Sequence, residues 1–436
     1  MDDAELLSTS TGITLRRYLE THPSRVLSTQ PCSTCRPAEN GELPGLNESG
    51  SQVGAAELVH VGSPHEDPSG QWKLAKGVRL VCNGCMRTLV TGAAGFIGST
   101  IVELLRDGGH EVVCVDLLLD RAHQSRPAWV DADLHIVDVR DEAPLTELLS
   151  GIDVVCHQAA MVGLGLTIHD APDYASHNVV GTASLVSAMA RAGVSGLVQA
   201  SSMVVYGGGR EICLVHGDVA TRPRTFEDLR MGCFEPRCVV CGEPVSWGLV
   251  AEDAPLKPHN AYAATKLAQE HLAIAWAEQC GGRAISLRYH NVYGPRMPRD
   301  TPYAGVASIF RSALAAGRAP KVYEDGLQMR DFVHVLDVAR ANVTALEALA
   351  LGAPGATSGH RAYNVGSGEP RTVLDLATAL ACELDGPEPV VVGGGRPGDV
   401  RHVVADPARI KVELGFASRV PFGDGIAEFA TAPMRT

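Results

Sequence analysis

Short apolar runs alternate along the chain with longer runs whose apolar positions follow a helical period, and this alternation begins at Met86. The longer runs cover residues 97–107, 173–192 and 261–279, as expected of amphipathic helices. Strands separated by helices in this way pair in parallel, so the pattern predicts an α/β fold with a doubly wound parallel sheet. The predicted strands are residues 87–92, 111–116, 134–139, 154–159, 197–202 and 284–290.

The first strand and the first helix are joined by a glycine-rich turn, RTLVTGAAGFIGS, which contains Gly92, Gly95 and Gly98. Glycines at this spacing let a phosphate approach the backbone, and the N-terminus of the helix offers free N–H groups and a positive dipole end. The next strand ends in Asp116, where a carboxylate would meet a dinucleotide ribose. A plain strand–helix turn is the alternative, and Asp116 weighs against it. The stretch therefore predicts a Rossmann-like dinucleotide site.

The rest of the chain divides by pattern. Residues 1–85 are rich in Gly, Ser, Pro and Glu, which predicts a poorly structured extension ahead of a functional protein that begins at Met86. Residues 86–290 would be the cofactor-binding domain. Looser, shorter elements follow, so residues 291–436 would be a smaller C-terminal substrate-binding domain. Residues 207–250 lie where a much shorter connection would do, and are predicted to be a Cys-rich insertion.

Composition excludes several classes of protein. With 45% hydrophobic and 20% charged residues the chain has an ordinary globular make-up, and its formal charge of −13 gives no reason to bind nucleic acid or an anionic membrane. The sequence shows no apolar run of membrane-spanning length and no cationic, signal-like start. A cytoplasmic protein without a nucleic-acid or membrane partner is therefore expected.

The insertion carries a possible metal site. Cys213-x-x-His216 is followed by Cys238-x-x-Cys241, a spacing typical of a closed, four-ligand structural zinc site. Cys233 could replace one ligand, and solitary cysteines on a loop are the alternative. A weaker zinc-ribbon pattern pairs Cys32 and Cys35 with Cys82 and Cys85.

Tyr262 and Lys266 form a candidate catalytic pair. They lie four residues apart on a predicted helix, so both side chains share one face. A free phenol is a poor base at neutral pH, and a nearby cation stabilises its phenolate. Ser202, at the end of an earlier predicted strand, could hydrogen-bond the same substrate oxygen.

In this order, these features resemble the extended short-chain dehydrogenase/reductase family, and more narrowly its NAD-dependent nucleotide-sugar epimerase/dehydratase branch. The resemblance runs from Met86 to about Gly425 without the insertion. The motifs that carry it are TGAAGFIGS, HQAA (157–160), SSMVVYG (201–207), YAATK (262–266), RYHNVYGP (288–295), RDFVHVLDV (330–338), YNVGSG (363–368) and RPGDVRH (396–402).

The resemblance implies a role for each matching residue. Tyr262 would be the catalytic base, Lys266 its pKa modulator and a ribose ligand, and Ser202 the third catalytic member. Asp116 would hold the adenosine ribose and favour NAD over NADP. The remaining cofactor residues would be Gly92, Gly95, Phe96, Ile97, Gly98, Asp138, Val139, Ala159, Ala160 and Ser201. Asn291, Arg330, Arg396 and Asp399 would bind the sugar nucleotide.

The reaction type is narrowed by two positions. A 4,6-dehydratase usually carries Asp-Glu directly after the catalytic serine or threonine, and here Met203 and Val204 stand there. The resemblance thus implies a 4-epimerase with a transient 4-keto sugar, and the Cys-rich insertion resembles that of epimerases acting on dTDP-6-deoxyhexoses such as dTDP-L-rhamnose. A UDP-sugar 4-epimerase, a 4-ketoreductase or dehydratase, and a non-enzymatic NAD(P) sensor stay open as alternatives. The resemblance also implies a homodimer.

Overall fold

A computed structural model describes residues 65–66, 72–73, 85–120, 122–123, 126–127, 133–163, 168–299, 305–352, 359–395 and 399–435. The chain divides into two units between Ala55 and Ala56, and every described residue belongs to the second. Most of the predicted extension, including Cys32, Cys35 and Cys82, lies outside the described residues. Within the described part, β1 (His65–Glu66) pairs antiparallel with β2 (Trp72–Lys73).

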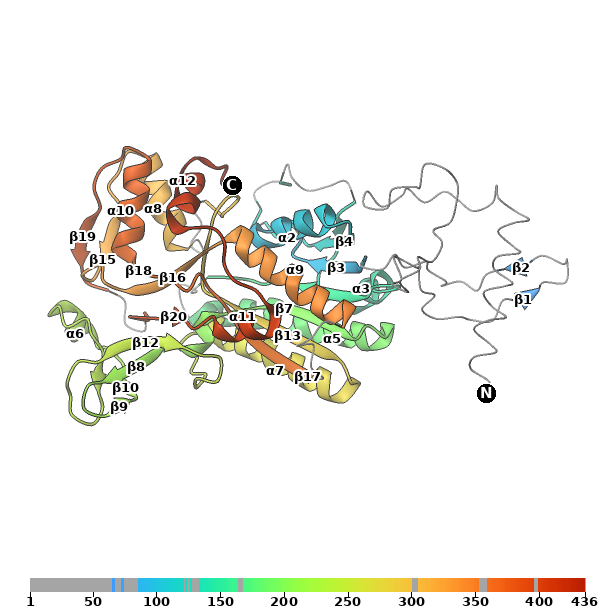
Figure 1. The fold of residues 1–436 in the computed structure, drawn as a ribbon, viewed down its shortest axis with the longest axis horizontal. Helices are drawn as coiled ribbons and strands as arrows, with labels where there is room; N and C mark the ends of the chain where they lie inside the picture. Colours follow the sequence, from blue (N-terminus) through green and yellow to red (C-terminus); the bar gives the residue numbers. More distant parts are fainter. Residues whose placement is uncertain are drawn as a thin grey trace, which may run out of the picture. The chain divides into compact units, whose positions relative to one another are not determined.

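A seven-stranded parallel sheet forms the centre of the second unit (Figure 1). Its order is β17-β13-β7-β6-β3-β4-β5, so the chain starts in the middle and moves first to one edge and then to the other. This is the predicted doubly wound, Rossmann-like α/β fold. The strands are β3 (Arg87–Thr91), β4 (Glu111–Asp116), β5 (His135–Ile136), β6 (Val154–His157), β7 (Gly196–Ser202), β13 (Arg283–Tyr289) and β17 (Gly359–Val365).

The strand predicted over residues 134–139 is cut short to β5 because the chain turns at Asp138. The Asp138 carboxylate accepts hydrogen bonds from the backbone N–H and the guanidinium of Arg140, and the Asp138 carbonyl accepts from the N–H of Asp141. Such a local turn competes with a strand ladder. It also keeps Asp138 near the carboxyl end of the sheet.

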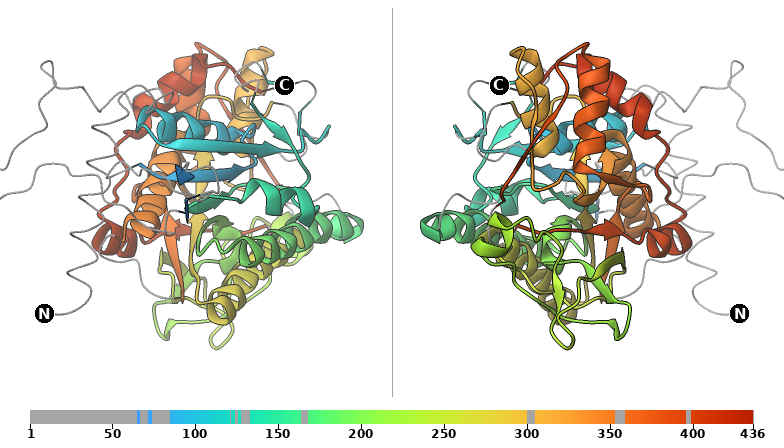
Figure 2. Two further views of the ribbon diagram at one scale, coloured as in Figure 1. Left: turned by 90° about the vertical axis from the view of Figure 1, so that its right-hand side faces the viewer. Right: turned by 90° about the vertical axis from the view of Figure 1, so that its left-hand side faces the viewer.

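Helices cover both faces of the sheet (Figure 2). One apolar cluster joins the sheet to α2 and α9, and a second joins it to α3, α5 and α7. The predicted helical run 173–192 is present but contains a π-helical stretch, Ala175–Val180, between α4 (Ala171–Tyr174) and α5. The remaining bounds are α2 (Phe96–Asp107), α3 (Glu142–Leu148), α5 (Gly181–Ala192), α7 (Ala261–Cys280) and α9 (Val335–Leu351).

The sheet also draws on residues beyond 290. Strand β17 pairs with β13 over its whole length, and α9 packs against α2 and the sheet. The second domain predicted over 291–436 therefore contributes two elements to the cofactor-binding layer. The sequence pattern alone could not assign them, because apolar runs of this length fit either domain.

The other elements after residue 290 surround a separate apolar core around Phe310, Phe332 and Phe429. They form a three-stranded sheet, order β14-β16-β18, and a two-stranded sheet of β15 and β19, packed with helices. Their bounds are β14 (Asn291–Tyr293), β15 (Lys321–Tyr323), β16 (Met329–His334), β18 (Pro370–Thr372), β19 (Val390–Gly393), α8 (Val306–Ala315), α10 (Val373–Glu383) and α12 (Phe422–Thr431). The C-terminal part also contains β20 (Val404–Ala405) and α11 (Ala408–Leu414). No described helix is both long and apolar enough to cross a membrane.

The insertion, residues 207–250, folds as a small β-rich region beside the elements that follow residue 290 (Figure 1). Its strands β12 and β8 continue to β20 of the C-terminal part in a four-stranded sheet, order β20-β12-β8-β9. Two ion pairs of buried arginine side chains also connect the insertion to the C-terminal part of the chain. Arg224 pairs with Glu324 at 2.7 Å, and Arg401 pairs with Glu235 at 2.6 Å. Its elements are β8 (Arg210–Cys213), β9 (Gly217–Asp218), β10 (Thr221–Arg222), α6 (Phe226–Arg230), β11 (Arg237–Cys238) and β12 (Ser246–Val250).

Candidate functional site

A cavity of about 420 Å³ opens at the carboxyl ends of the central strands. Ligands of open α/β sheets bind at this position. Every residue that the resemblance assigned to the dinucleotide lines the wall, as do Ser202 and Asn291. The structure therefore brings together Gly92, Gly95, Phe96, Ile97, Gly98, Asp116, Asp138, Val139, Ala159, Ala160, Ser201, Ser202, Tyr262, Lys266 and Asn291.

The glycine turn leaves no room for side chains. A Cβ at Gly92, whose φ is +68°, would stand 2.7 Å from the backbone nitrogen of Ala159, and one at Gly98 would stand 2.0 Å from the Gly92 carbonyl oxygen. Gly95 is the N-cap of α2 and supplies no side-chain cap. Phe96, Ile97 and Gly98 of the first turn of α2 line the cavity. The N–H groups of a first helical turn have no intrahelical acceptors, so this position fits the pyrophosphate of a dinucleotide.

Asp116 ends β4 with its carboxylate held in place. It accepts hydrogen bonds from the N–H groups of Ala94 at 3.0 Å and Leu118 at 2.8 Å. Two lone-pair positions are used in this way, which leaves capacity for a ribose hydroxyl. Asp138, the second acid on the wall, binds Arg140, and this hydrogen bond holds the pKa of Asp138 below its usual range. The position of Asp116 at the end of β4 fits a dinucleotide with an unmodified ribose.

Tyr262 and Lys266 lie on α7, whose N-cap Asn260 accepts from the N–H of Ala263 at 2.8 Å. Burial raises the pKa of Tyr262 to about 12, and a hydrogen bond with Ser202 acts in the opposite direction. Lys266 is 2% exposed and donates to the Ala200 carbonyl at 3.0 Å. Burial lowers the pKa of Lys266 to about 7. The predicted catalytic set is therefore assembled at the cavity, in a desolvated environment.

Behind this set lies a charged pair that the sequence did not single out. Glu270 follows Lys266 by one helical turn and pairs with Arg288 at 2.8 Å, both side chains being almost completely buried. Glu270 also accepts a hydrogen bond from Ser201. Its charge acts to raise the pKa of Lys266 and so offsets part of the burial effect. The pair fixes the Ser201 end of β7 against α7.

The predicted sugar-nucleotide residues do not all meet. Asn291 lines the cavity with a buried Oδ1 atom that has no hydrogen-bond partner among the described residues, so it is available to a ligand. Arg330 instead donates to the carbonyls of Met329, Val400 and Arg401. Burial lowers its pKa to about 10. It is not on the cavity wall, and neither is Asp399, while Arg396 lies outside the described residues.

Some wall residues were not among the predicted site residues. Arg435 reaches the cavity from the C-terminal tail, and His123 and His290 line it from loops. His290 and Asn291 belong to one quoted motif, so the histidine could have been noted there. Arg435 belongs to no motif, and only the fold brings it to the glycine turn.

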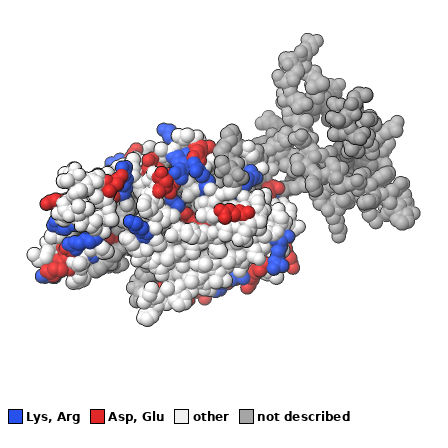
Figure 3. Space-filling view, turned by 90° about the horizontal axis from the view of Figure 1, so that it is seen from below, with Lys and Arg blue, Asp and Glu red and all other residues white. Residues whose placement is uncertain are grey.

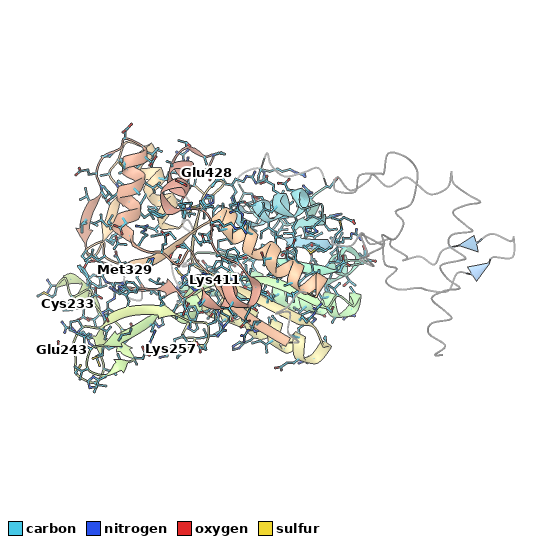
Figure 4. All side chains as sticks on the ribbon, viewed as in Figure 1. Cys233, Glu243, Lys257, Met329, Lys411 and Glu428 are labelled. Carbon is cyan, nitrogen blue, oxygen red and sulfur yellow. The ribbon has the colours of Figure 1, made fainter. Side chains whose placement is uncertain are left out.

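The four predicted metal ligands of the insertion converge. One ligand atom from each of Cys213, His216, Cys238 and Cys241 lies within 4.8 Å of the others. The Sγ atom of Cys213 is 3.6 Å from that of Cys241 and 3.5 Å from His216 Nδ1. Ligand atoms about 2.0–2.3 Å from a tetrahedral zinc ion are separated by such distances. Cys233, labelled in Figure 4, is not part of this group.

Both ligand pairs also have the backbone of a metal-binding knuckle. Gly217 follows His216 with φ +68°, and Gly242 follows Cys241 with φ +76°. At the first pair, the backbone N–H groups of Val215 and His216 donate to Cys213 and lower its pKa to about 6. The thiolate form is the metal ligand. The donor set therefore fits a structural zinc ion.

The cavity, the glycine turn and the Ser–Tyr–Lys set define a dinucleotide-dependent enzyme of the Rossmann type. Residues 88–226 and 243–366 match the model of the NAD dependent epimerase/dehydratase family, so the chain belongs to this family, as its motifs predicted. The unmatched residues 227–242 lie inside the insertion.

Several known proteins are similar over nearly their whole length. The dTDP-L-rhamnose 4-epimerase of Burkholderia thailandensis is 32% identical over 361 residues, covering 79% of this chain and 94% of that protein. The UDP-glucose 4-epimerase of Mycolicibacterium smegmatis is 34% identical over 348 residues, covering 79% and 97%. The structure of the Thermus thermophilus UDP-glucose 4-epimerase in complex with NAD matches with a TM-score of 0.62 and 30% identity, covering 79% and 98%.

Proposed function

We propose that the protein is an NAD-dependent 4-epimerase of a nucleotide-activated sugar, with a dTDP-6-deoxyhexose such as dTDP-L-rhamnose as the substrate. The observation that carries the proposal is the convergence of Ser202, Tyr262 and Lys266 on a cavity that begins at the glycine turn. Relatives that share most of the chain are named as 4-epimerases of dTDP-L-rhamnose and of UDP-glucose. They support the reaction more strongly than the choice of sugar.

In the proposed reaction Tyr262 accepts the proton of the sugar 4-hydroxyl, and Ser202 hydrogen-bonds the same oxygen. Lys266 supplies the positive charge that stabilises the phenolate. Bound NAD would supply the hydride acceptor at C4 and, after the keto sugar has turned, the hydride donor to its opposite face. Tyr262 then returns its proton to the oxygen, so the reaction is redox-neutral and requires no cofactor exchange.

Two observations favour a deoxy sugar and disfavour dehydration. The cavity wall includes Met161, Val162 and Phe332, which suit a methyl group at C6 better than a carboxylate. Directly after Ser202, the turn η3 (Met203–Tyr206) carries no acid at Met203 or Val204. Elimination of water across C5 and C6 needs an additional acid–base pair at these positions, and neither side chain can move a proton.

Incubation of the purified protein with dTDP-, UDP- and GDP-sugars, followed by NMR of the products, tests the proposal. We expect interconversion of the two C4 epimers of one dTDP-6-deoxyhexose without added NAD. Accumulation of NADH with a keto sugar would indicate a dehydrogenase, and a 4-keto-6-deoxy product would indicate a dehydratase. No turnover of any sugar, with NAD bound reversibly, would indicate a sensor.

We also propose a structural zinc ion at Cys213, His216, Cys238 and Cys241. With four protein ligands the ion would have no open position for substrate, so its contribution would be to the stability of the insertion. The protein is further proposed to be a homodimer, which the family resemblance implies.

A further inference from the structure

Arg435 lies on the wall of the dinucleotide cavity although it is far in sequence from every cofactor motif. Its Nη1 atom is 3.9 Å from the point where a Cβ on Gly95 would stand. Gly95 is the N-cap of α2, in the middle of the glycine turn. The guanidinium is therefore next to the part of the cavity that fits the dinucleotide phosphates.

The tail that carries Arg435 is fixed by hydrogen bonds on both sides. After α12, the carbonyl of Ala432 accepts from Arg311, and that of Pro433 accepts from the N–H of Arg296 at 2.8 Å. Arg435 itself donates through its N–H to the Met297 carbonyl at 3.1 Å and accepts from the Arg299 N–H at 2.8 Å. The tail thus lies parallel to residues 296–299, with an isolated β-bridge between Arg435 and Pro298. This pairing determines where the side chain enters the cavity.

The guanidinium carries a charge that its surroundings compensate only in part. Its Nε atom is buried and has no hydrogen-bond partner among the described residues. Burial lowers the pKa of Arg435, and Asp116 acts in the opposite direction. A half-buried cation with an unpartnered buried donor is destabilising unless an anion binds it. An anionic ligand at this end of the cavity would remove that cost.

We propose that Arg435 binds the pyrophosphate of the dinucleotide and so completes the phosphate site of the glycine turn. This inference rests on the proposed NAD site. The turn offers neutral N–H groups, and a guanidinium adds positive charge and two parallel donors. The tail would in this way couple the C-terminal part of the chain to retention of the cofactor.

The test compares ligands that contain and lack phosphate. Full-length protein freed of bound nucleotide is titrated calorimetrically with NAD and ADP, with adenosine as a competitor. For Arg435→Ala we expect NAD and ADP to bind about 10- to 100-fold more weakly, because a hydrogen bond from a charged group is lost. The affinity for adenosine should stay unchanged. Arg435→Lys should recover part of this affinity, because lysine keeps the positive charge but lacks the two parallel N–H donors of the guanidinium.

Arg299→Ala is the matched control, since Arg299 lies on the segment that is hydrogen-bonded to the tail but not on the cavity wall. It should bind all three ligands like the parent. Unchanged NAD and ADP affinity in Arg435→Ala, or an equal loss for adenosine, would overturn the proposal. Thermal melts of Arg435→Ala and Arg299→Ala identify any general loss of folding. If Arg435→Ala does not fold, the affinities of Arg435→Lys decide the test. These measurements need no turnover, so failure of the epimerase proposal would be seen separately.

Discussion

Lys266 is buried and Tyr262 is half-buried, and removal from water acts on their pKa values in opposite directions. It raises the pKa of the phenol to about 12 and lowers that of the ammonium to about 7. Burial thereby raises the free energy of the charged form of each group. A cation next to the phenol has more effect here than in water, because the surroundings screen it less.

Tyr262→Phe should abolish turnover while leaving the fold intact. The substitution removes only the hydroxyl group, and the ring keeps its contact with Tyr174, whose centroid is 5.8 Å away. We expect kcat to fall about 100-fold or more, the usual contribution of a general acid–base group. Epimerisation kinetics and a thermal melt check this. Near-normal kcat would exclude Tyr262 as the base.

Lys266→Met should shift the pH dependence of the reaction. Without the ammonium group the phenolate of Tyr262 is less stable, so the pKa of Tyr262 rises and its deprotonated fraction at a given pH falls. We expect the acid limb of kcat/KM to move to higher pH by about 1 unit or more. An acid limb at the parent's position, at any level of residual activity, would contradict this role.

Asp116→Asn should weaken the discrimination between NAD and NADP. The N–H groups of Ala94 and Leu118 donate to different oxygens of the carboxylate, so the amide of asparagine can keep one of these hydrogen bonds and loses the other together with the charge. Without that charge a 2′-phosphate is no longer repelled, and Arg435 nearby would attract it. Titration with both cofactors should give a smaller ratio of their Kd values than in the parent. An unchanged ratio would refute the assignment.

At the scale of elements, the sequence predicted those parts that depend on local pattern. The apolar runs located β3, β4, β6, β7 and β13, because parallel strands buried on both faces have few polar positions. The placement of β17 and α9 in the cofactor layer could not be predicted, since it depends on pairing with β13 and packing on α2.

The same limit applies to the site. Gly92, Asp116 and Tyr262 belong to motifs in which spacing determines the geometry, and all three line the cavity. Arg330 also belongs to a quoted motif, yet its guanidinium binds backbone carbonyls contributed by residues far along the chain. Arg435 has no local signal at all. Contacts between distant segments decide both cases.

The proposed zinc site of the insertion can be tested by removing one of its ligands. Cys238→Ser should lower bound zinc by about one equivalent, because serine is a poor ligand for zinc beside thiolates. Cys233→Ser is the matched control: it lies in the same insertion, outside the ligand group, and should keep the parent's metal content. Elemental analysis of the purified proteins measures this. Equal zinc content in the parent and in Cys238→Ser would refute the proposed zinc site.

At the scale of the whole molecule, one face of the second unit carries few charges. Seen from below, a broad uncharged area extends over the side on which α5 and α7 lie in Figure 1 (Figure 3). On α7, Ala264 is exposed, and Ala268 and Leu272, one and two helical turns further on, are half-buried. Small apolar side chains on a helix surface allow close packing of a second helix, so this face suits the proposed homodimer.

Ala264→Glu should therefore shift the protein from dimer to monomer. In a two-fold contact the same face meets itself, so one substitution places like charges on both sides and leaves each carboxylate partly desolvated. Val412→Glu on α11 is the control, because Val412 is 82% exposed and a charge there meets water. Analytical ultracentrifugation should give a dimer for the parent and for Val412→Glu, and a dissociating species for Ala264→Glu. A monomeric parent would exclude the homodimer. An Ala264→Glu dimer as stable as the parent dimer would show that the contact does not include this part of α7. The catalytic residues of α7 face the opposite side of the helix, so NAD binding should be the same in all three proteins.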